Sequence, residues 1–266
     1  MNDFDPALLR ELIAMLNSGG IEDAELEAKW ILEDAGSAEQ AREIARQRAK
    51  HAPLQYLLGK WEFYGLTVFV GPGVLIPRAD TETLVDAVLS RVKDKAGQRI
   101  ADLCTGSGCI ALALARHMPQ TVFTGADISE QALAYALKNK AHHKIQNADF
   151  VCEDVLSEAF AAQQHDLAAI VCNPPYLTAE DMQHLQAEVQ YEPETALYGD
   201  ADGLHFYREI TRLWKKTLCA GGLLAFETGC TQGSAVAGIL TENGFSGIEI
   251  LRDLNGMERV VLGQRG

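Results

Sequence analysis

Hydrophobic residues recur at steps of three and four through the first part of the chain. A run from Leu8 to Leu16 follows this spacing, and similar patterns cover about residues 22–35 and 37–50. This period is typical of amphipathic helices that bury one face. The pattern therefore predicts a small helical domain over residues 1–60.

The pattern changes over residues 61–76, where aromatic and β-branched residues are interrupted by Gly65 and by Gly71-Pro72-Gly73. Glycine and proline at such positions mark turns between strands. We expect this segment to be a β-hairpin linker. It separates the helical domain from a larger region over residues 77–266.

From residue 99 onward, short apolar runs alternate with longer amphipathic segments. Seven runs have the length and composition of buried strands, at residues 99–104, 121–126, 148–152, 167–172, 222–228, 246–251 and 257–262. Helices are expected at residues 81–92, 107–117, 129–141, 203–218 and 231–243. This alternation predicts an α/β fold with a parallel sheet and right-handed crossovers. Only a short turn joins the last two strands, so the final strand is expected to run antiparallel.

Composition excludes several classes of protein. No apolar run reaches the roughly 18 residues that span a bilayer, and the first residues lack the basic-then-apolar pattern of a signal peptide. The six cysteines show no Cys-x-x-Cys pair and no zinc-ligand spacing, so we expect no metal site and no disulfide framework. Cys104, Cys152 and Cys172 are expected in the core. The chain is expected to be a cytoplasmic monomer without a membrane partner.

The charge is strongly acidic, with 23 basic against 37 acidic residues and a net charge of −14. Such a surface repels a phosphate backbone and attracts basic proteins, which argues against a stable nucleic-acid partner. The basic cluster is expected to be a solvated surface with a few ion pairs; it comprises Arg42, Arg46, Arg48 and Lys50.

The strongest local signal for a cofactor is a glycine-rich turn after the first strand of the alternating region. Backbone without side chains can pass close to a ligand at the carboxyl end of a strand. The turn lacks the Gly-Lys-Ser/Thr ending of a phosphate loop and the third glycine of a dinucleotide fingerprint. Its candidate cofactor-binding residues are Cys104, Thr105, Gly106, Ser107 and Gly108.

Two later strands end in acids that suit the same cofactor. Asp127 ends the second strand, where a carboxylate can accept both ribose hydroxyls of a nucleoside. The alternative role for Asp127 is an N-cap of the next helix, which Ser129 could equally provide. Asp154 and Val155, after the third strand, are placed to meet an adenine edge, unless Asp154 is an ordinary loop acid.

The fourth strand runs into Asn173-Pro174-Pro175-Tyr176. Two prolines cannot continue a strand ladder, so this is a stiff turn with an amide side chain at the strand end. The Asn173 side-chain oxygen and the Pro174 carbonyl can accept the two N–H bonds of a planar amide or amine, and the Tyr176 ring can pack on it. Asn173 also lies close enough to the glycine turn to meet the cofactor. The alternative is a rigid structural turn.

Asn-Pro-Pro-Tyr after the fourth strand, combined with the glycine turn, resembles the amino-group methyltransferases. Other segments resemble the HemK/PrmC family over nearly the whole chain: Pro53-Leu54-Gln55-Tyr56-x-x-Gly59, Phe63-Tyr64-Gly65, Ile76-Pro77-Arg78-x-Asp80-Thr81-Glu82, Tyr191-Glu192-Pro193, Leu197 to Leu204, Tyr207-Arg208 and Asp253-Leu254-x-Gly256. The resemblance implies a seven-stranded, Rossmann-like class I methyltransferase fold with S-adenosylmethionine as cofactor. It also implies methylation of the glutamine side-chain amide in the Gly-Gly-Gln loop of peptide chain release factors.

The chain departs from this family at three positions. Cys104 stands where glycine is usual, Ala79 replaces a proline, and Thr228 stands where isoleucine is common. None of these removes a candidate catalytic group, but Cys104 places a side chain beside the cofactor.

All cofactor signals follow residue 99, so the helical domain and the hairpin are expected to recognise the protein substrate. Two other functions remain open at this point. One is an adenine-N6 nucleic-acid methyltransferase, which shares the Asn-Pro-Pro-Tyr turn. The other is a catalytically silent binding module.

Overall fold

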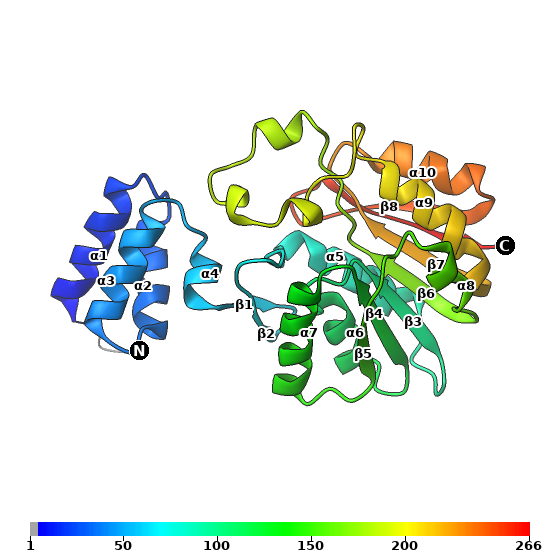
Figure 1. Ribbon diagram of the computed structural model, residues 1–266, viewed down its shortest axis with the longest axis horizontal. Helices are drawn as coiled ribbons and strands as arrows, with labels where there is room; N and C mark the ends of the chain where they lie inside the picture. The colour runs from blue at the N-terminus through cyan, green and yellow to red at the C-terminus, as the bar shows by residue number, and fades with distance from the viewer. Residues whose placement is uncertain (1–4) are drawn as a thin grey trace.

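The computed structural model describes residues 5–266 and has a helical bundle at one end and an α/β domain at the other (Figure 1). The bundle consists of α1 (Pro6–Ser18), α2 (Ala24–Asp34) and α3 (Ala38–Arg48), followed by the short α4 (Leu54–Leu58). Leu12, Leu16 and Ile31 are fully buried between the helices. The predicted helical region is therefore present; its first four residues lie outside the described part of the chain.

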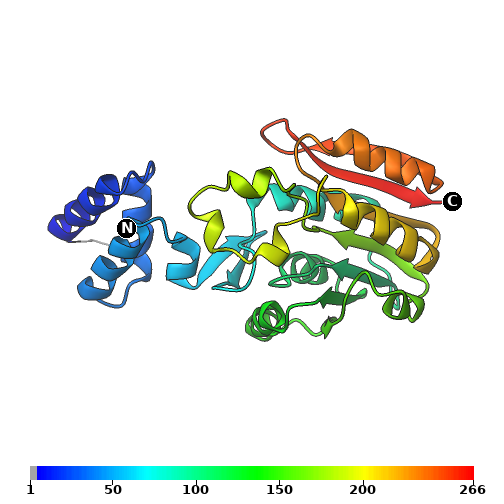
Figure 2. The same ribbon diagram turned by 45° about the horizontal axis from the view of Figure 1, so that its top comes forward.

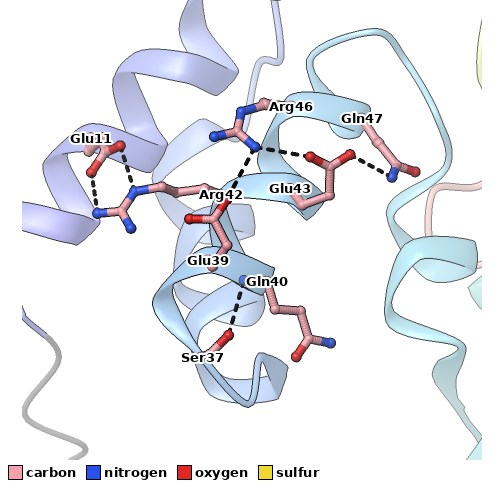
Figure 3. Close-up of polar contacts among 8 residues, drawn as sticks. All are labelled: Glu11, Ser37, Glu39, Gln40, Arg42, Glu43, Arg46 and Gln47. Atoms are coloured by element: carbon pink, nitrogen blue, oxygen red, sulfur yellow. Dashed lines mark hydrogen bonds and ion pairs between the residues drawn. The ribbon is translucent and has the colours of Figure 1, made fainter.

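The basic residues of α3 behave in two ways. Arg42 pairs with Glu11 of α1 at 2.9 Å and Arg46 pairs with Glu43 at 3.0 Å on the outer surface, as predicted (Figure 3). The prediction was wrong for Arg48, which is only 8% exposed. Its guanidinium binds Glu27 of α2 at 2.7 Å and Glu188 of the distant C-terminal region at 2.8 Å.

The predicted hairpin is present as β1 (Lys60–Phe63) and β2 (Leu66–Phe69), which pair antiparallel. Phe63 and Val68 are buried in the same hydrophobic cluster as the helices of the α/β domain. The buried Asn139 accepts a hydrogen bond from the Phe69 backbone at 2.7 Å and donates to the Ser107 carbonyl at 3.0 Å. The hairpin thus packs into the α/β core and is tied to the glycine turn.

A seven-stranded sheet forms the centre of the α/β domain. Its strands are β3 (Arg99–Leu103), β4 (Val122–Asp127), β5 (Ala148–Cys152), β6 (Leu167–Cys172), β7 (Leu218–Glu227), β8 (Phe245–Arg252) and β9 (Glu258–Arg265). They lie in the order β5-β4-β3-β6-β7-β9-β8. The first five pair in parallel, and β9 runs antiparallel to both neighbours. This confirms the predicted sheet and its antiparallel last strand.

Helices cover both faces of this sheet (Figure 2). One hydrophobic cluster joins the hairpin to α5 (Glu82–Arg91), α6 (Cys109–His117) and α7 (Glu130–His143). A second cluster holds α8 (Glu158–Ala162), α9 (His205–Trp214) and α10 (Gly233–Glu242). The sequence pattern did not predict α8, because five residues are too few to display a helical period.

The segment between β6 and α9 has no long regular element. It contains the short 3₁₀ helices η2 (Asp181–Gln183), η3 (Val189–Tyr191) and η4 (Glu194–Ala196). It lies between the helical bundle and the sheet in both views (Figures 1 and 2), and Arg48 binds Glu188 within it. Two further 3₁₀ helices are η1 (Ala79–Thr81) and η5 (Lys215–Thr217).

The cysteines are all free. Cys172 is buried as predicted, and Cys104 is partly exposed. The prediction was wrong for Cys152, which is exposed because it ends the edge strand β5. Within residues 5–266, no helix is both long and apolar enough to cross a membrane.

Candidate active site

A cavity opens at the carboxyl ends of the parallel strands β3 to β6. This edge of an open parallel sheet is where ligands bind, because the connections diverge on either side of the first strand. The predicted cofactor residues that line the cavity are Cys104, Thr105, Gly106, Ser107, Asp127, Asp154, Val155 and Asn173. Segments far from these in sequence complete the lining, at residues 73–81, 193–196 and 206.

The glycine turn after β3 has a backbone that favours glycine at three positions. Cys104, Gly106 and Gly108 all have positive φ, at 58°, 56° and 76°. A Cβ at Gly108 would come within 2.7 Å of the Phe150 ring, so this glycine permits close packing. Gly108 is the one predicted cofactor residue outside the cavity lining. Cys104 adopts the same left-handed conformation although it has a Cβ. Glycine suits this position because it reaches positive φ without a steric cost.

Asp102 stabilises the turn from below. It is fully buried, and its Oδ2 accepts hydrogen bonds from the Thr105 hydroxyl at 2.6 Å and the Ala111 backbone at 3.1 Å. Its Oδ1 has no partner, and burial raises the pKa of Asp102 to about 7. This carboxyl therefore has a structural role, because its hydrogen bonds hold the backbone of the turn in place.

Asp127 lies at the end of β4 with its carboxyl on the cavity. Its two oxygens accept backbone hydrogen bonds, from Gly106 at 2.8 Å and Ser129 at 2.9 Å. Burial raises its pKa, and these hydrogen bonds oppose the rise. Ser129 caps α7 by accepting from the Ala132 backbone at 3.1 Å. The N-cap role is thus filled by Ser129, which leaves the Asp127 carboxyl beside the cavity.

Asn173 stands at the boundary between this cavity and a second one. The second cavity is lined by Leu75, Arg78, Asn173, Tyr176, Leu177, Asp181, His184, Leu185, Gln186, Val189, Ala196, Leu197 and Glu227. Asn173 Nδ2 donates to the Thr81 hydroxyl over 3.5 Å. With its amide N–H₂ facing Thr81, Asn173 has its Oδ1 free to accept from a ligand.

The remaining residues of the Asn-Pro-Pro-Tyr turn divide between the two cavities. Pro175 lines the first cavity and Tyr176 the second, whereas Pro174 is buried and lines neither. The Tyr176 carbonyl accepts from the Gln232 side chain at 3.0 Å. Burial raises the pKa of Tyr176 to about 12, so its phenol is neutral at physiological pH.

A polar layer behind Asn173 was not predicted from the sequence. Glu227 ends β7 and is 1% exposed, and burial raises its pKa to about 7. The neighbouring Thr81 hydroxyl, the charge of Arg259 and the Asn173 amide oppose that rise. Arg259 in turn pairs with Asp80 at 3.1 Å and with Asp253 at 3.2 Å.

Several segments that carried the family resemblance meet in this layer. Asp80 and Thr81 belong to the Ile-Pro-Arg segment, and Asp253 belongs to the late Asp-Leu-x-Gly segment. Arg78, from the same Ile-Pro-Arg segment, pairs with the buried Glu192 of the Tyr-Glu-Pro segment, whose Oε2 accepts from the Ile76 backbone at 3.0 Å. These motifs marked the residues as part of a site in the sequence. A motif does not show which residue pairs with which until the fold is known.

Comparisons with known proteins fit this geometry. A family model, the methyltransferase small domain, matches residues 75–191. A release factor glutamine methyltransferase of Thermodesulfovibrio yellowstonii is 42% identical over 227 residues, covering 84% of this chain and 80% of that protein. The same-named protein of Geobacter sulfurreducens is 39% identical over 93% of this chain and 92% of its own length. This chain belongs to the release factor glutamine methyltransferase family.

Membership of the release factor glutamine methyltransferase family confirms the resemblance found in the sequence and makes the chain a methyltransferase. Among solved structures, the hMettl16 catalytic domain in complex with MAT2A 3′UTR hairpin 6 has a TM-score of 0.62 at 17% identity, covering 84% of this chain and 82% of that one. At this identity the likeness shows the shared fold alone.

Proposed function

We propose that this chain transfers a methyl group from S-adenosylmethionine to the side-chain amide nitrogen of the glutamine in the Gly-Gly-Gln loop of peptide chain release factors. The observation that carries this proposal is the position of Asn173 between two cavities, with its N–H₂ on Thr81. Its Oδ1 is then available to accept an N–H from an amide in the second cavity.

The first cavity has the chemistry that S-adenosylmethionine requires. The carboxylate of Asp127 suits the two ribose hydroxyls, and the half-buried turn at residues 104–107 brings backbone close to the ligand. Asp154 and the apolar side chains of Ile128 and Val155 suit an adenine ring with a polar edge. Bound S-adenosylmethionine supplies an electrophilic methyl group on a positively charged sulfur.

The second cavity has the chemistry that a planar amide requires. An amide nitrogen is a poor nucleophile because its lone pair is delocalised into the carbonyl. Asn173 Oδ1 accepts one of its N–H bonds and so directs the lone pair toward the first cavity. The carbonyl of Pro174, the other acceptor predicted from the sequence, belongs to a residue that lines neither cavity in this structure. Tyr176 packs its neutral ring against the amide plane, and Pro175 forms part of the wall on the side of the first cavity. Orientation and fixed dipoles supply the rate enhancement without a strong base.

The charge distribution supports a basic protein as the partner. The chain carries a net charge of −14. A groove between the bundle and the η2–η4 segment is lined by the acids Glu22, Asp23, Glu27, Glu188 and Glu192 and by Arg48 and Arg78, which pair with three of them. Glu22 and Asp23 remain as the acids of this groove that pair with neither arginine. Release-factor loops enter a ribosomal centre rich in RNA, so their surface near the glutamine is expected to be basic. We place the reaction in the cytoplasm, with a monomer carrying the whole site.

The test offers labelled S-adenosylmethionine with three acceptors to the full-length protein: a release factor, DNA and RNA. We expect label on the release factor alone. A release factor with its Gly-Gly-Gln glutamine changed to alanine is the matched control and should remain unlabelled. Label on adenine in DNA or RNA would replace this proposal with the adenine-N6 alternative. Binding of the cofactor without transfer to any acceptor would favour a silent binding module.

The helical region is proposed to recognise the release factor, because it borders the acidic groove and lies away from the cofactor cavity. A chain that begins at Pro53 removes α1–α3 and keeps the hairpin that belongs to the α/β core. We expect calorimetry to give an unchanged affinity for S-adenosylmethionine while kcat/KM for intact release factor falls at least about tenfold, the loss of a moderate protein contact. Normal kcat/KM in this shortened chain would contradict the assignment.

A further inference from the structure

The register of two neighbouring strands places Glu227 beside Asn173. In the parallel pair β6–β7, Cys172 lies opposite Phe226. The next residue after Cys172 is Asn173, just past the end of β6, and the next residue after Phe226 is Glu227, the last residue of β7. Side chains in register on adjacent parallel strands point to the same side of the sheet. Both side chains line the second cavity.

Thr81 completes a triangle with these two residues. It is 2% exposed at the junction of η1 and α5, and its hydroxyl accepts from Asn173 Nδ2 over 3.5 Å. Having accepted there, the hydroxyl keeps its own proton to donate to the Glu227 carboxyl. The Asn173 amide thus faces two oxygen-bearing groups on its N–H₂ side.

A carboxylate in this place needs a reason, because burial disfavours its charge and an apolar residue would pack there at lower cost. Glu227 Oε2 has no hydrogen-bond partner, so the group is not fully satisfied by the fold. Arg259 is the nearest cation, but its guanidinium is held by Asp80 and Asp253. The carboxyl of Glu227 therefore remains directed to the catalytic turn.

We propose that Glu227, acting with Thr81, is a positioning residue for methyl transfer that fixes the Asn173 amide with its N–H₂ inward and its Oδ1 toward the acceptor. This inference rests on the proposed function and assigns the group that orients its key acceptor. The negative charge of the ionised Glu227 carboxylate also attracts the Asn173 N–H₂ hydrogens. This polarises the amide and makes Oδ1 a stronger hydrogen-bond acceptor. Polarisation along a hydrogen-bonded chain strengthens each bond in it.

Ionisation of Glu227 gives the proposal a pH dependence. Burial raises the pKa of Glu227 to about 7, so the carboxylate form grows as the pH rises through this value. The charged groups around it are Arg259 and Asp80 and, in the same cavity, Arg78 and Asp181; the titratable ones are Tyr176, Tyr207, Cys109 and the cavity residue His184. Burial raises the pKa of the two tyrosines and of the cysteine, so they stay neutral near pH 7, and comparison with Glu227→Gln separates the contribution of Glu227 from that of His184. The transfer rate constant should therefore increase from pH 6 to pH 8.

The first experiment measures the Asn173 side chain itself. In the ¹⁵N-labelled full-length protein, the Asn173 N–H₂ resonances should shift with pH around 7 in the wild type and stay constant in Glu227→Gln. This measurement needs no acceptor, so it is independent of whether a release factor is the substrate. Asn173 resonances that are constant in the wild type, or that titrate equally in Glu227→Gln, would overturn the proposal.

The second experiment is a double-mutant cycle on single-turnover transfer to a release factor, with both substrates saturating. Glu227→Gln should lower the rate constant about tenfold and flatten its pH profile, within the usual range for contacting residues. In the Asn173→Ala background, the same change should have about a twofold effect or less, because the group that Glu227 positions is already gone. Equal losses in both backgrounds would show that Glu227 acts independently of Asn173.

Thr81 supplies a second route if Glu227→Gln does not fold. Thr81→Val should lower the rate constant with the same dependence on Asn173, and Thr81→Ser should restore it, because serine keeps the hydroxyl. The thermal unfolding midpoint and the dispersion of the NMR spectrum verify the fold of each variant. Failure of Thr81→Ser to rescue the rate would contradict the positioning role. If wild-type protein methylates no release factor while its Asn173 resonances still follow Glu227, the proposed function fails and the positioning role stands.

Discussion

The two cavities that meet at Asn173 are assembled in different ways. Every candidate cofactor residue of the first cavity lies at or just after the end of a parallel strand, at 104–107, 127–129, 154–156 and 173, and distant segments only complete the lining. The second is lined entirely by segments around Arg78, from Asn173 to Leu197 and at Glu227. In the first, the sheet brings the candidate cofactor residues together, because the carboxyl ends of parallel strands share one edge. In the second, long connections must fold back over that edge.

This difference suggests a division of labour. In the first cavity, both oxygens of the Asp127 carboxyl already accept backbone hydrogen bonds, from Gly106 and Ser129. The second contains Glu227, a buried carboxyl with an unpartnered oxygen. A site with unfilled hydrogen-bonding capacity is suited to respond to a substrate, whereas a satisfied one is suited to hold a constant cofactor.

The largest expected effect comes from Asn173→Asp, which keeps the shape of the side chain and removes its N–H₂ donor. Because Asn173 donates to Thr81 in the structure, the carboxylate would lose that anchor and face Glu227 as a like charge. We expect single-turnover transfer to be almost abolished even when S-adenosylmethionine is saturating. Substantial residual activity would mean that Asn173 acts only as an acceptor and needs no anchor.

Asn173→Ala should have the next largest effect. It removes one oriented partner of the reacting amide without adding a charge, which typically lowers a rate about 10²–10³-fold. The loss should fall on the transfer step and leave the affinity for release factor nearly unchanged. Single-turnover measurement with saturating release factor separates the two. A near-normal transfer rate in Asn173→Ala would mean that the Asn-Pro-Pro-Tyr turn has only a structural role.

The sequence predicted most of the cofactor-binding residues of the first cavity but not the polar layer of the second. Apart from Asn173, eight residues were predicted to bind the cofactor, and seven of them line the first cavity. The eighth, Gly108, packs against Phe150 instead. A short motif at a strand end carries that information locally. The parallel sheet and the antiparallel β9 were also predictable, because the alternation of strands and helices and the short last turn constrain them.

The polar layer of the second cavity was not predictable in this way. Thr81 and Glu227 are 146 positions apart, and neither has a local pattern that distinguishes it from a helix cap or a strand end. Only the β6–β7 register and the docking of α5 bring them to Asn173. The same limit explains the error at Arg48, since its partner Glu188 lies in a segment without periodicity.

Asp127→Ala tests the first cavity and should have an intermediate effect. The variant loses a carboxylate that can bind the ribose, so S-adenosylmethionine should bind about 1–3 kcal/mol more weakly, the scale of a lost charge-assisted hydrogen bond. Calorimetry measures this directly. Ser129→Ala is the matched control, because it removes the cap of α7 beside Asp127 and should lower stability by about 1 kcal/mol with little effect on affinity. Equal affinities in Asp127→Ala and wild type would remove Asp127 from the cofactor site.

Cys104→Gly should have the smallest effect, and it tests whether the first cavity tolerates its one departure from glycine. The left-handed backbone at φ 58° costs an L-residue about 1–2 kcal/mol. Glycine would relieve that cost but would add about 0.5–1 kcal/mol of backbone entropy to the unfolded chain.

The side chain of Cys104 also packs against the cluster around Cys172, and that contact would be lost. These opposing contributions nearly cancel, so stability and cofactor affinity should each change by about 1 kcal/mol or less. Cys104→Ala is the control, because it removes the sulfur and keeps the Cβ that strains the backbone. The difference between the two variants isolates the backbone contribution. If Cys104→Gly weakens S-adenosylmethionine binding more than about tenfold, which is about 1.4 kcal/mol, the sulfur itself contacts the cofactor.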